Sequence, residues 1–290
     1  MLLLPALALN VLISSGTFLV AKRTVVEFPP LVLALFRFVL AAGVLWPLVR
    51  LLGPRQRIER ADRGRILLVG ILGVPLNQGL FLLGIQWASV SHSALLYALA
   101  PAFVLLIGAI RGSARPSLAQ FAGVAIAFGG VLLLLLQRGL HFDRHSVRGD
   151  LVVLIAVVAW AAYLVAGRRL THRYGSLLVT SETLLSGTLI FLPIGLLALP
   201  GFHPAAITRP AWWGLGYLAW LTSVGTYILW FWALKYLKTT TVATITNLQP
   251  LVAAALAWVF LREPLPAGFL LSMGLVLGGV WLTRIGPEVH

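Results

Sequence analysis

The stretch that decides the fold is ASVSHSALLYALAPAFVLL, Ala88 to Leu106, a small and polar start followed by an apolar segment that a proline interrupts. A second stretch, LKTTTVATITNLQPLVAAA at Leu237 to Ala255, repeats this order of features. Its Pro250 follows Pro101 by 149 residues. An internal repeat of this kind indicates one structural unit written more than once.

The repeat extends beyond these stretches. The same offset pairs Gly130 with Gly279, and an offset of 146 residues pairs Pro47 with Pro193. The three-residue change falls in a connecting loop, where insertions are best tolerated. We therefore predict two five-helix copies, residues 1–141 and 142–290.

Composition points to a membrane protein. Of the 290 residues, 60% are hydrophobic and 10% are charged, and there is no cysteine. A soluble domain carries about 25% charged residues. The net charge of +14 does not indicate nucleic acid as a partner, because the cations lie between apolar runs and no soluble domain presents a basic face. We expect the lipid bilayer to be the solvent.

The chain divides into apolar runs of about 20 residues, the length that spans a bilayer. We predict an all-α integral membrane protein with ten spans, at approximately 2–21, 31–52, 66–86, 89–111, 118–137, 150–170, 176–200, 211–236, 240–261 and 266–285.

The positive charges predict the orientation. With the N-terminus inside, the inner loops hold twice as many Lys and Arg residues as the outer loops. Both termini are therefore expected in the cytoplasm. Because five spans per copy is an odd number, the second copy enters the membrane inverted. Inverted repeats are typical of secondary transporters, which bind a small-molecule substrate between the halves.

Prolines and glycines indicate helix breaks and helix contacts. Pro101 and Pro250 each remove a backbone donor near mid-span, which predicts either a packing kink or a hinge. We expect small residues to let spans 5 and 10 approach closely: Gly123, Gly129, Gly130, Gly274, Gly278 and Gly279.

Uncharged polar and aromatic residues at mid-span are the candidates for substrate contact. Unpaired amides are costly in hydrocarbon, so the polar ones either bond neighbouring helices or line a pathway. The aromatic ones either pack or form cavity walls with polar tips. The candidate substrate-binding residues are Asn10, Ser14, Thr17, Asn77, Gln78, Phe81, Tyr97, Trp160, Tyr163, Tyr227, Trp230, Thr244 and Asn247.

Two charged residues fall within spans, Arg37 and Glu182. We expect Arg37 to extend toward the membrane interface or to bond a helix end, and not to pair with Glu182, because the two enter from opposite faces. Glu182 is a candidate proton carrier. The six His are scattered, so we expect no metal, no cofactor and no catalytic site.

Several motifs resemble one family. They are Ser15-Gly16-Thr17-Phe18-Leu19-Val20-Ala21-Lys22, Phe36-Arg37-Phe38, Leu248-Gln249-Pro250-Leu251 and Leu261-Arg262-Glu263-Pro264-Leu265. They resemble the EamA family of the drug/metabolite transporter superfamily. The first copy departs at Ser113-Ala114-Arg115-Pro116, which lacks the glutamate found at Glu263.

The resemblance implies ten helices in inverted repeats, a central cavity and alternating access. It also implies that spans 5 and 10 are peripheral in a monomer or homodimer. Within the family the chain looks most like the YddG-type exporters of aromatic amino acids, in a bacterial inner membrane.

Three functions remain open at this point. The first is export of amino acids or similar small metabolites, which the deep aromatic residues favour. The second is export of drugs or organic cations, which requires acidic residues along the pathway. The third is a membrane protein that is not a transporter, such as an enzyme or an assembly subunit. An enzyme is disfavoured because the chain has only 8 Asp and Glu residues.

Overall fold

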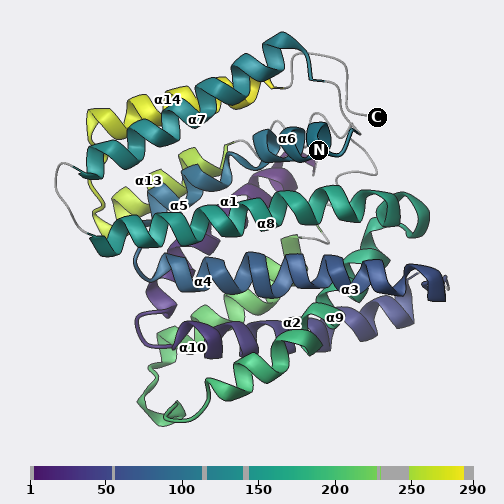
Figure 1. The fold of residues 1–290 in the computed structure, drawn as a ribbon. Coiled ribbons are helices and arrows are strands. Elements are labelled where there is room, and N and C mark those ends of the chain that lie inside the picture. Colours follow the sequence, from purple (N-terminus) through teal and green to yellow (C-terminus); the bar gives the residue numbers. More distant parts are fainter. Residues whose placement is uncertain are drawn as a thin grey trace.

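The structure, a computed structural model, describes residues 3–53, 56–112, 116–139, 144–226, 229 and 248–283. All regular elements in these ranges are helices, which lie side by side as Figure 1 shows. They are α1 (Leu3–Thr24), α2 (Pro30–Leu52), η1 (Arg60–Asp62), α3 (Arg63–Ile71), η2 (Leu72–Gly79), α4 (Leu80–Ile85), α5 (Val90–Tyr97), α6 (Ala100–Ile110), α7 (Leu118–Gly139), α8 (Arg144–Tyr174), α9 (Ser176–Leu197), η3 (Pro204–Ala206), α10 (Arg209–Gly216), η4 (Tyr217–Gly225), α13 (Gln249–Leu261) and α14 (Ala267–Leu282).

The predicted all-α membrane architecture is confirmed. Within the described residues, seven helices are long and apolar enough to cross a membrane, and α13 and α14 are shorter apolar helices. The third span consists of α3, η2 and α4, and the fourth consists of α5 and α6. The eighth span begins with α10 and η4, and the ninth ends with α13. Residues 230–247, between η4 and α13, lie outside the described residues.

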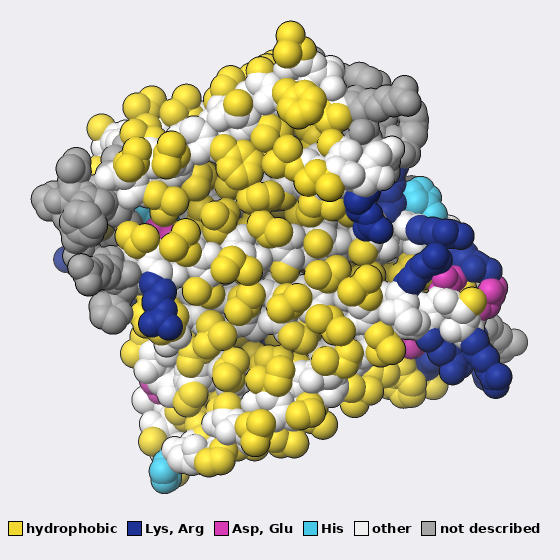
Figure 2. Space-filling model, in the orientation of Figure 1, with side chains coloured by type: hydrophobic (Ala, Val, Ile, Leu, Met, Phe, Trp, Pro, Cys, Tyr) yellow, Lys and Arg dark blue, Asp and Glu magenta, His cyan; other side chains and the backbone are white. Residues whose placement is uncertain are grey.

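The outer surface has the character that a bilayer requires. Figure 2 shows a broad hydrophobic face with Lys and Arg side chains gathered at its edges. Large apolar side chains point away from the protein, among them Ile110, which is 85% exposed, and Leu197, which is 82% exposed. A soluble protein rarely exposes so continuous an apolar surface, and lipid tails satisfy it here.

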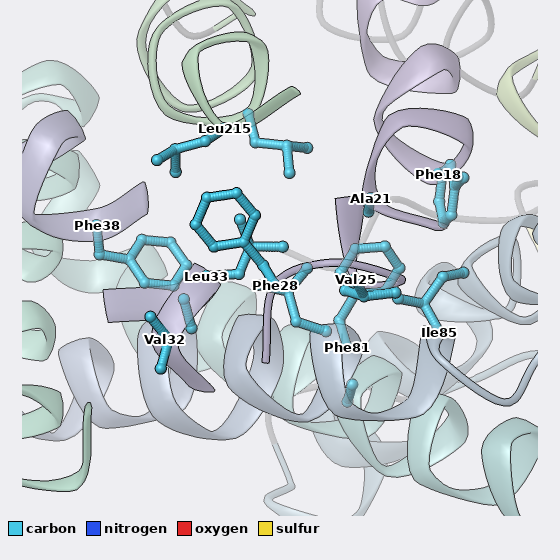
Figure 3. Close-up of a cluster of buried hydrophobic side chains, with 14 of the residues drawn as sticks. Phe18, Ala21, Val25, Phe28, Val32, Leu33, Phe38, Phe81, Ile85 and Leu215 are labelled. Carbon is cyan, nitrogen blue, oxygen red and sulfur yellow. The ribbon is translucent and has the colours of Figure 1, made fainter. Parts of the chain in front are cut away.

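The interior is close-packed where α1, α2, α4 and α10 meet. Figure 3 shows Phe28 lying among side chains that include Leu33 and Leu215, and Phe28 is buried. Its ring also contacts those of Phe202 and Trp212, at centroid distances of 5.7 and 5.1 Å. Lipid tails are as apolar as leucine, so these contacts stabilise the fold by van der Waals packing more than by removal of surface from water.

Helices α2 and α9 demonstrate the inversion of the second copy. They occupy corresponding places in the two copies and lie side by side in Figure 1. The end of α2 contacts the start of α9 through Arg50 and Glu182, 2.7 Å apart. The start of α2 contacts the end of α9, where a Cβ on Gly195 would come within 2.8 Å of Leu35. The two helices therefore run in opposite directions.

The proline breaks recur with the same geometry. α6 and α13 each begin one residue before their proline, Pro101 or Pro250. The preceding residues are Leu99, with φ −72° and ψ −11°, and Leu248, with φ −74° and ψ −14°. Each leucine carbonyl then accepts the first hydrogen bond of the new helix, from Phe103 and Val252 respectively. The predicted break at Pro101 is confirmed, since α5 ends at Tyr97; the segment before Leu248 lies outside the described residues, so at Pro250 only the start of α13 is seen.

A second shared irregularity was not predicted. The π-helical segments η2 and η4 lie at matching positions of the two copies, offset by about 146 residues. A π-helical turn contains an extra residue and is found most often at functional sites. Pro75 lies inside η2 and cannot donate a backbone hydrogen bond. η4 contains no proline, so nothing in its sequence signals the same irregularity.

The predicted contact between spans 5 and 10 is present as α7 against α14. A Cβ on Gly279 would lie 2.5 Å from the carbonyl oxygen of Gly123, and a Cβ on Gly130 would lie 2.9 Å from that of Ser272. The expectation was wrong for three other glycines of these helices, because a Cβ there would meet nothing within 4 Å among the described residues. They are Gly129, Gly274 and Gly278. One helical position is a rotation of about 100°, so adjacent glycines face different surroundings.

This difference between neighbours gives a matched pair of substitutions. Gly279→Ala places a methyl group against the backbone of α7 and is expected to destabilise the protein by about 1–3 kcal/mol. Gly278→Ala adds the same methyl group in open space and gains helix propensity of up to about 1 kcal/mol. Thermal unfolding in detergent should therefore separate the two variants. Equal melting temperatures would contradict the close contact.

Candidate functional site

Three aromatic side chains from the first copy meet inside the bundle. Phe18 of α1, Phe81 of α4 and Tyr97 of α5 lie with every pair of ring centroids 5.6 Å apart. All three pairs have edge-to-face geometry, which is the favourable arrangement for aromatic rings. The structure thus brings together two predicted site residues, Phe81 and Tyr97, on either side of the turn between α4 and α5.

Asn77 connects this aromatic group to the second copy. Its Nδ2 donates to the Tyr97 hydroxyl at 2.7 Å and to the carbonyl oxygen of Ala156 in α8 at 2.8 Å. Its Oδ1 accepts a bond from Gln78 Nε2 at 2.7 Å. Asn77 is fully buried and lies within η2. Both ends of its amide therefore have partners, and it holds Tyr97 in one position.

A second aromatic group comes from α8. The rings of Trp160 and Tyr163 are stacked, with centroids 5.1 Å apart and planes 9° apart. A Cβ on Gly73 of η2 would lie 3.0 Å from the Tyr163 ring. The missing side chain at Gly73 therefore lets this ring lie against η2, near the same segment that carries Asn77.

The polar residues of α1 face η4. Asn10 Nδ2 donates to the carbonyl oxygen of Thr226 at 2.9 Å, and the hydroxyls of Thr17 and Thr222 are 3.0 Å apart. Asn10 and Thr17 are buried, whereas Ser14, between them, is half-buried. Two of the three predicted polar residues on α1 thus join the copies, and Ser14 retains more exposed surface.

Arg37 does not extend toward the interface, and that prediction was wrong. The residue is 3% exposed, and its Nε donates to Ser223 Oγ of η4 at 3.2 Å. With an offset of 146 residues, Ser223 corresponds to Asn77, so equivalent positions of the two π-helical segments both bond a polar side chain. The helical face that carries Arg37 points into the protein, and apolar pattern alone did not reveal this.

Glu182 lies against Arg50, and this ion pair joins α9 to α2 near the end of the bundle. Its side chain is 17% exposed. The expectation that it does not pair with Arg37 agrees with this contact. Four candidate residues, Tyr227, Trp230, Thr244 and Asn247, lie outside the described residues.

Sequence reasoning missed most of the polar contacts at the two ends of the bundle. At one end, which we call the Lys22 end, Lys22 Nζ donates to the carbonyl oxygens of Ile85, Gln86 and Ala88, at 3.0, 3.1 and 2.7 Å. The last carbonyl groups of a helix commonly lack partners within the helix. Here the Lys22 ammonium group donates to the carbonyl groups at the end of α4. A cation at the end of the first span was visible in the sequence, but its target was not.

At the opposite end of α2, which we call the Asp62 end, Asp62 is buried. It accepts hydrogen bonds from the Tyr174 hydroxyl at 2.9 Å and from Arg173 at 2.8 Å. The corresponding contact at the Lys22 end is that of Glu27 with Thr208, whose backbone N–H and hydroxyl both donate at 2.8 Å. An offset of 146 residues relates Glu27 to Arg173 and Asp62 to Thr208.

The chain is similar to known membrane transporters along nearly its whole length. The model of the EamA-like transporter family matches two successive segments, residues 2–136 and 147–285. A protein of Archaeoglobus fulgidus named an uncharacterized transporter is 29% identical over 280 residues, which cover 96% of this chain and 95% of that one.

Two relatives have names that specify a substrate. A probable terminal-alkyne amino-acid exporter of Streptantibioticus cattleyicolor is 30% identical, covering 86% of this chain and 82% of its own. A probable amino-acid metabolite efflux pump of Salmonella typhimurium is 29% identical, with 98% and 95% covered. One crystal structure is similar with a TM-score of 0.63 and 20% identity, over 96% of this chain and 94% of the other, and shows the shared fold.

The Asn77 contacts give a test of the site geometry. Asn77→Leu removes the bonds to Tyr97 and Ala156, and interhelical hydrogen bonds of this kind contribute about 1–2 kcal/mol. We expect a lower melting temperature in detergent than for Gln78→Leu, which removes only the described bond to Asn77. If Gln78→Leu destabilises the protein more, Asn77 is not the residue that joins η2 to α5 and α8.

Proposed function

Because this chain belongs to the EamA-like transporter family, we propose that it exports amino acids with aromatic or other apolar side chains, or closely related small metabolites. It is a multi-pass membrane transporter, and the substrate and the direction of transport are the proposed parts. The observation that carries the proposal is the pair of aromatic groups inside the bundle, one from each copy.

These groups suit a substrate with a flat apolar part and a polar part. Tyr97 and the stacked pair of Trp160 and Tyr163 are half-buried and retain exposed surface, and the buried Phe18 and Phe81 pack against Tyr97. Aromatic side chains combine large contact area with polar tips. An aromatic amino acid would stack on the rings and use the neighbouring amides and hydroxyls for its amino and carboxylate groups.

The names of two relatives support this substrate class. One is called an amino-acid exporter and another an amino-acid metabolite efflux pump. Export of organic cations lacks comparable support. The described acidic residues within or at the ends of the spans already contact basic or polar groups, as Glu182 does with Arg50 and Glu27 with Thr208.

The proposed mechanism is alternating access. The copies, residues 1–141 and 142–290, would rock relative to one another and expose the substrate to each side in turn. Pro101 and Pro250 would act as hinges, because each lacks the backbone donor that keeps a helix continuous. Their equal geometry supports equivalent roles in the two halves of the cycle.

The proposed substrate class can be tested with purified protein in liposomes loaded with unlabelled phenylalanine. Labelled phenylalanine should accumulate by counterflow above the level of empty liposomes, and a panel of organic cations should compete weakly. If organic cations show counterflow and amino acids do not, the substrates are organic cations and the proposed class is wrong.

A matched pair of tryptophans tests the proposed binding site. Trp160→Ala should reduce phenylalanine counterflow by up to about tenfold, since an aromatic pair contributes about 0.5–1.5 kcal/mol beyond its buried area. Trp213→Ala is the control, because Trp213 is 78% exposed on the outer surface. If both variants transport equally well, substrate does not contact the Trp160 stack.

Orientation is proposed from the loop charges, with the Asp62 end and both termini in the cytoplasm of a bacterial inner membrane. The chain has no cysteine, so single cysteines can be introduced without removing others. Val26→Cys, at a residue 80% exposed near the Lys22 end, should react with an impermeant maleimide in intact cells. His172→Cys, exposed near the Asp62 end, should react only after permeabilisation, and the reverse pattern would invert the proposed topology.

A further inference from the structure

Glu263 makes a contact between the copies at the Lys22 end. It follows α13, in the turn before α14, and its carboxylate faces the start of α5 in the first copy. Oε1 accepts a hydrogen bond from the Val90 N–H at 2.9 Å. Oε2 accepts two, from the Ser91 N–H at 3.1 Å and from the Ser91 hydroxyl at 2.9 Å.

The start of α5 is a favourable place for this carboxylate. The first N–H groups of a helix have no partner within the helix, and the helix dipole attracts negative charge there. Val90 and Ser91 are buried, so water is a poor alternative partner. Hydrogen bonds to a charged acceptor are stronger than neutral ones. Separating Glu263 from α5 would therefore expose several donors at once.

The backbone before Glu263 adopts an unfavourable conformation. Arg262 has φ +53° and ψ +31°, and it is the only non-glycine residue with positive φ in the described part of the chain. The left-handed conformation is unfavourable for a residue that carries a side chain. The N–H of Glu263 nevertheless donates to the carbonyl oxygen of Ala257 at 3.2 Å, which closes the turn. The turn directs Glu263 toward α5.

Other side chains of the second copy surround the same turn of α5. His92 Nδ1 lies 3.0 Å from Asp150 Oδ2 of α8, and the His92 ring stacks on that of Phe269 in α14, with centroids 5.7 Å apart. The start of α5 is therefore held from several directions at the Lys22 end, with Glu263 making the most bonds to its backbone.

The Glu263 contact has no acidic equivalent in the first copy. The offset of 149 residues relates Glu263 to Ala114, and the segment Ser113-Ala114-Arg115-Pro116 contains no acid. By contrast, the contact of Glu27 with Thr208 has its equivalent in that of Arg173 with Asp62 at the other end. The copies thus share one type of end contact, whereas the sequence of the first copy offers no carboxylate for the other, whose equivalent residues lie outside the described part of the chain.

We propose that Glu263 is a positioning residue of the transport cycle that holds the Lys22 end closed; the equivalent position of the first copy, Ala114, carries no carboxylate. This inference rests on the alternating access proposed above. A contact that is made only while the Lys22 end is closed stabilises the conformation that is open at the Asp62 end, and losing it disfavours that conformation. In the proposed orientation, this conformation receives substrate from the cytoplasm.

The test measures access to the interior from each end, in the absence of substrate. Ser14→Cys serves as the reporter, because Ser14 is half-buried on the polar face of α1 and the chain has no other cysteine. An impermeant maleimide is applied in two membrane preparations of opposite sidedness, identified with Val26→Cys and His172→Cys. Adding Glu263→Gln should raise the labelling rate from the Lys22 end by roughly tenfold and lower it from the Asp62 end.

Two further variants make the result specific. Ser91→Ala removes one of the three hydrogen bonds to Glu263 and should shift labelling in the same direction by a smaller factor. Glu182→Gln, an acid near the Asp62 end, should not raise labelling from the Lys22 end. An unchanged labelling rate with Glu263→Gln would overturn the proposal. A rate that rises equally from both ends would also overturn it, because a general loosening of the fold gives access from both ends.

The outcome is separable from that of the substrate proposal. The labelling assay contains no amino acid, so a shift with Glu263→Gln supports the closure role even if phenylalanine counterflow fails. Conversely, phenylalanine counterflow with no labelling shift supports the substrate and removes the role of Glu263.

Discussion

The bilayer core offers no water to backbone N–H and C=O groups, and the rest of the structure depends on how the chain meets this constraint. Continuous helices satisfy it alone, but this chain interrupts its helices at mid-span and turns sharply at their ends. Several of these interruptions lie beside polar side chains that contact a distant segment. Lys22 bonds the carbonyls at the end of α4, Glu263 bonds the donors at the start of α5, and Asn77 joins η2 to α5 and α8. Glu263 and Asn77 also join the two copies, whereas the Lys22 contacts lie within the first copy.

This arrangement separates two kinds of chemistry along the membrane normal. Ion pairs and charged caps lie toward the ends of the bundle, as Arg50 with Glu182 and Arg173 with Asp62 illustrate. Between the ends the described polar groups include the amides of Asn10 and Asn77 and the hydroxyls of Thr17 and Thr222, and the Asn77 amide bonds the hydroxyl of Tyr97. Charged side chains are expensive at the bilayer centre, whereas amides and hydroxyls cost less and still give directional bonds. This arrangement suits the proposed recognition of shape and aromatic surface at the centre of the protein, with charge placed toward its ends.

The sequence predicted the features that depend on composition and repetition. Apolar runs gave the spans, and the matching prolines gave the break before α6 and the start of α13, because a missing backbone donor has the same effect in any context. It failed where the outcome depends on which way a side chain points. Arg37 was expected at the interface and lies buried, and Gly278 was expected at a helix contact that only its neighbour Gly279 makes. The π-helical segments, of which η4 has no proline, and the pairing of Asn77 with Tyr97 arise from tertiary packing, which single-sequence patterns do not encode.

The contact between α7 and α14 has an implication for the origin of the chain. The same helix of each copy supplies each side, and equivalent residues behave alike: Gly130 and Gly279 face the partner helix, while Gly129 and Gly278 do not. A surface that meets its own duplicate across a two-fold axis is the arrangement found in symmetric dimers. An ancestral polypeptide of half this length, inserted in both orientations, would already have possessed this self-complementary surface, and gene fusion would then have made a pre-existing association permanent.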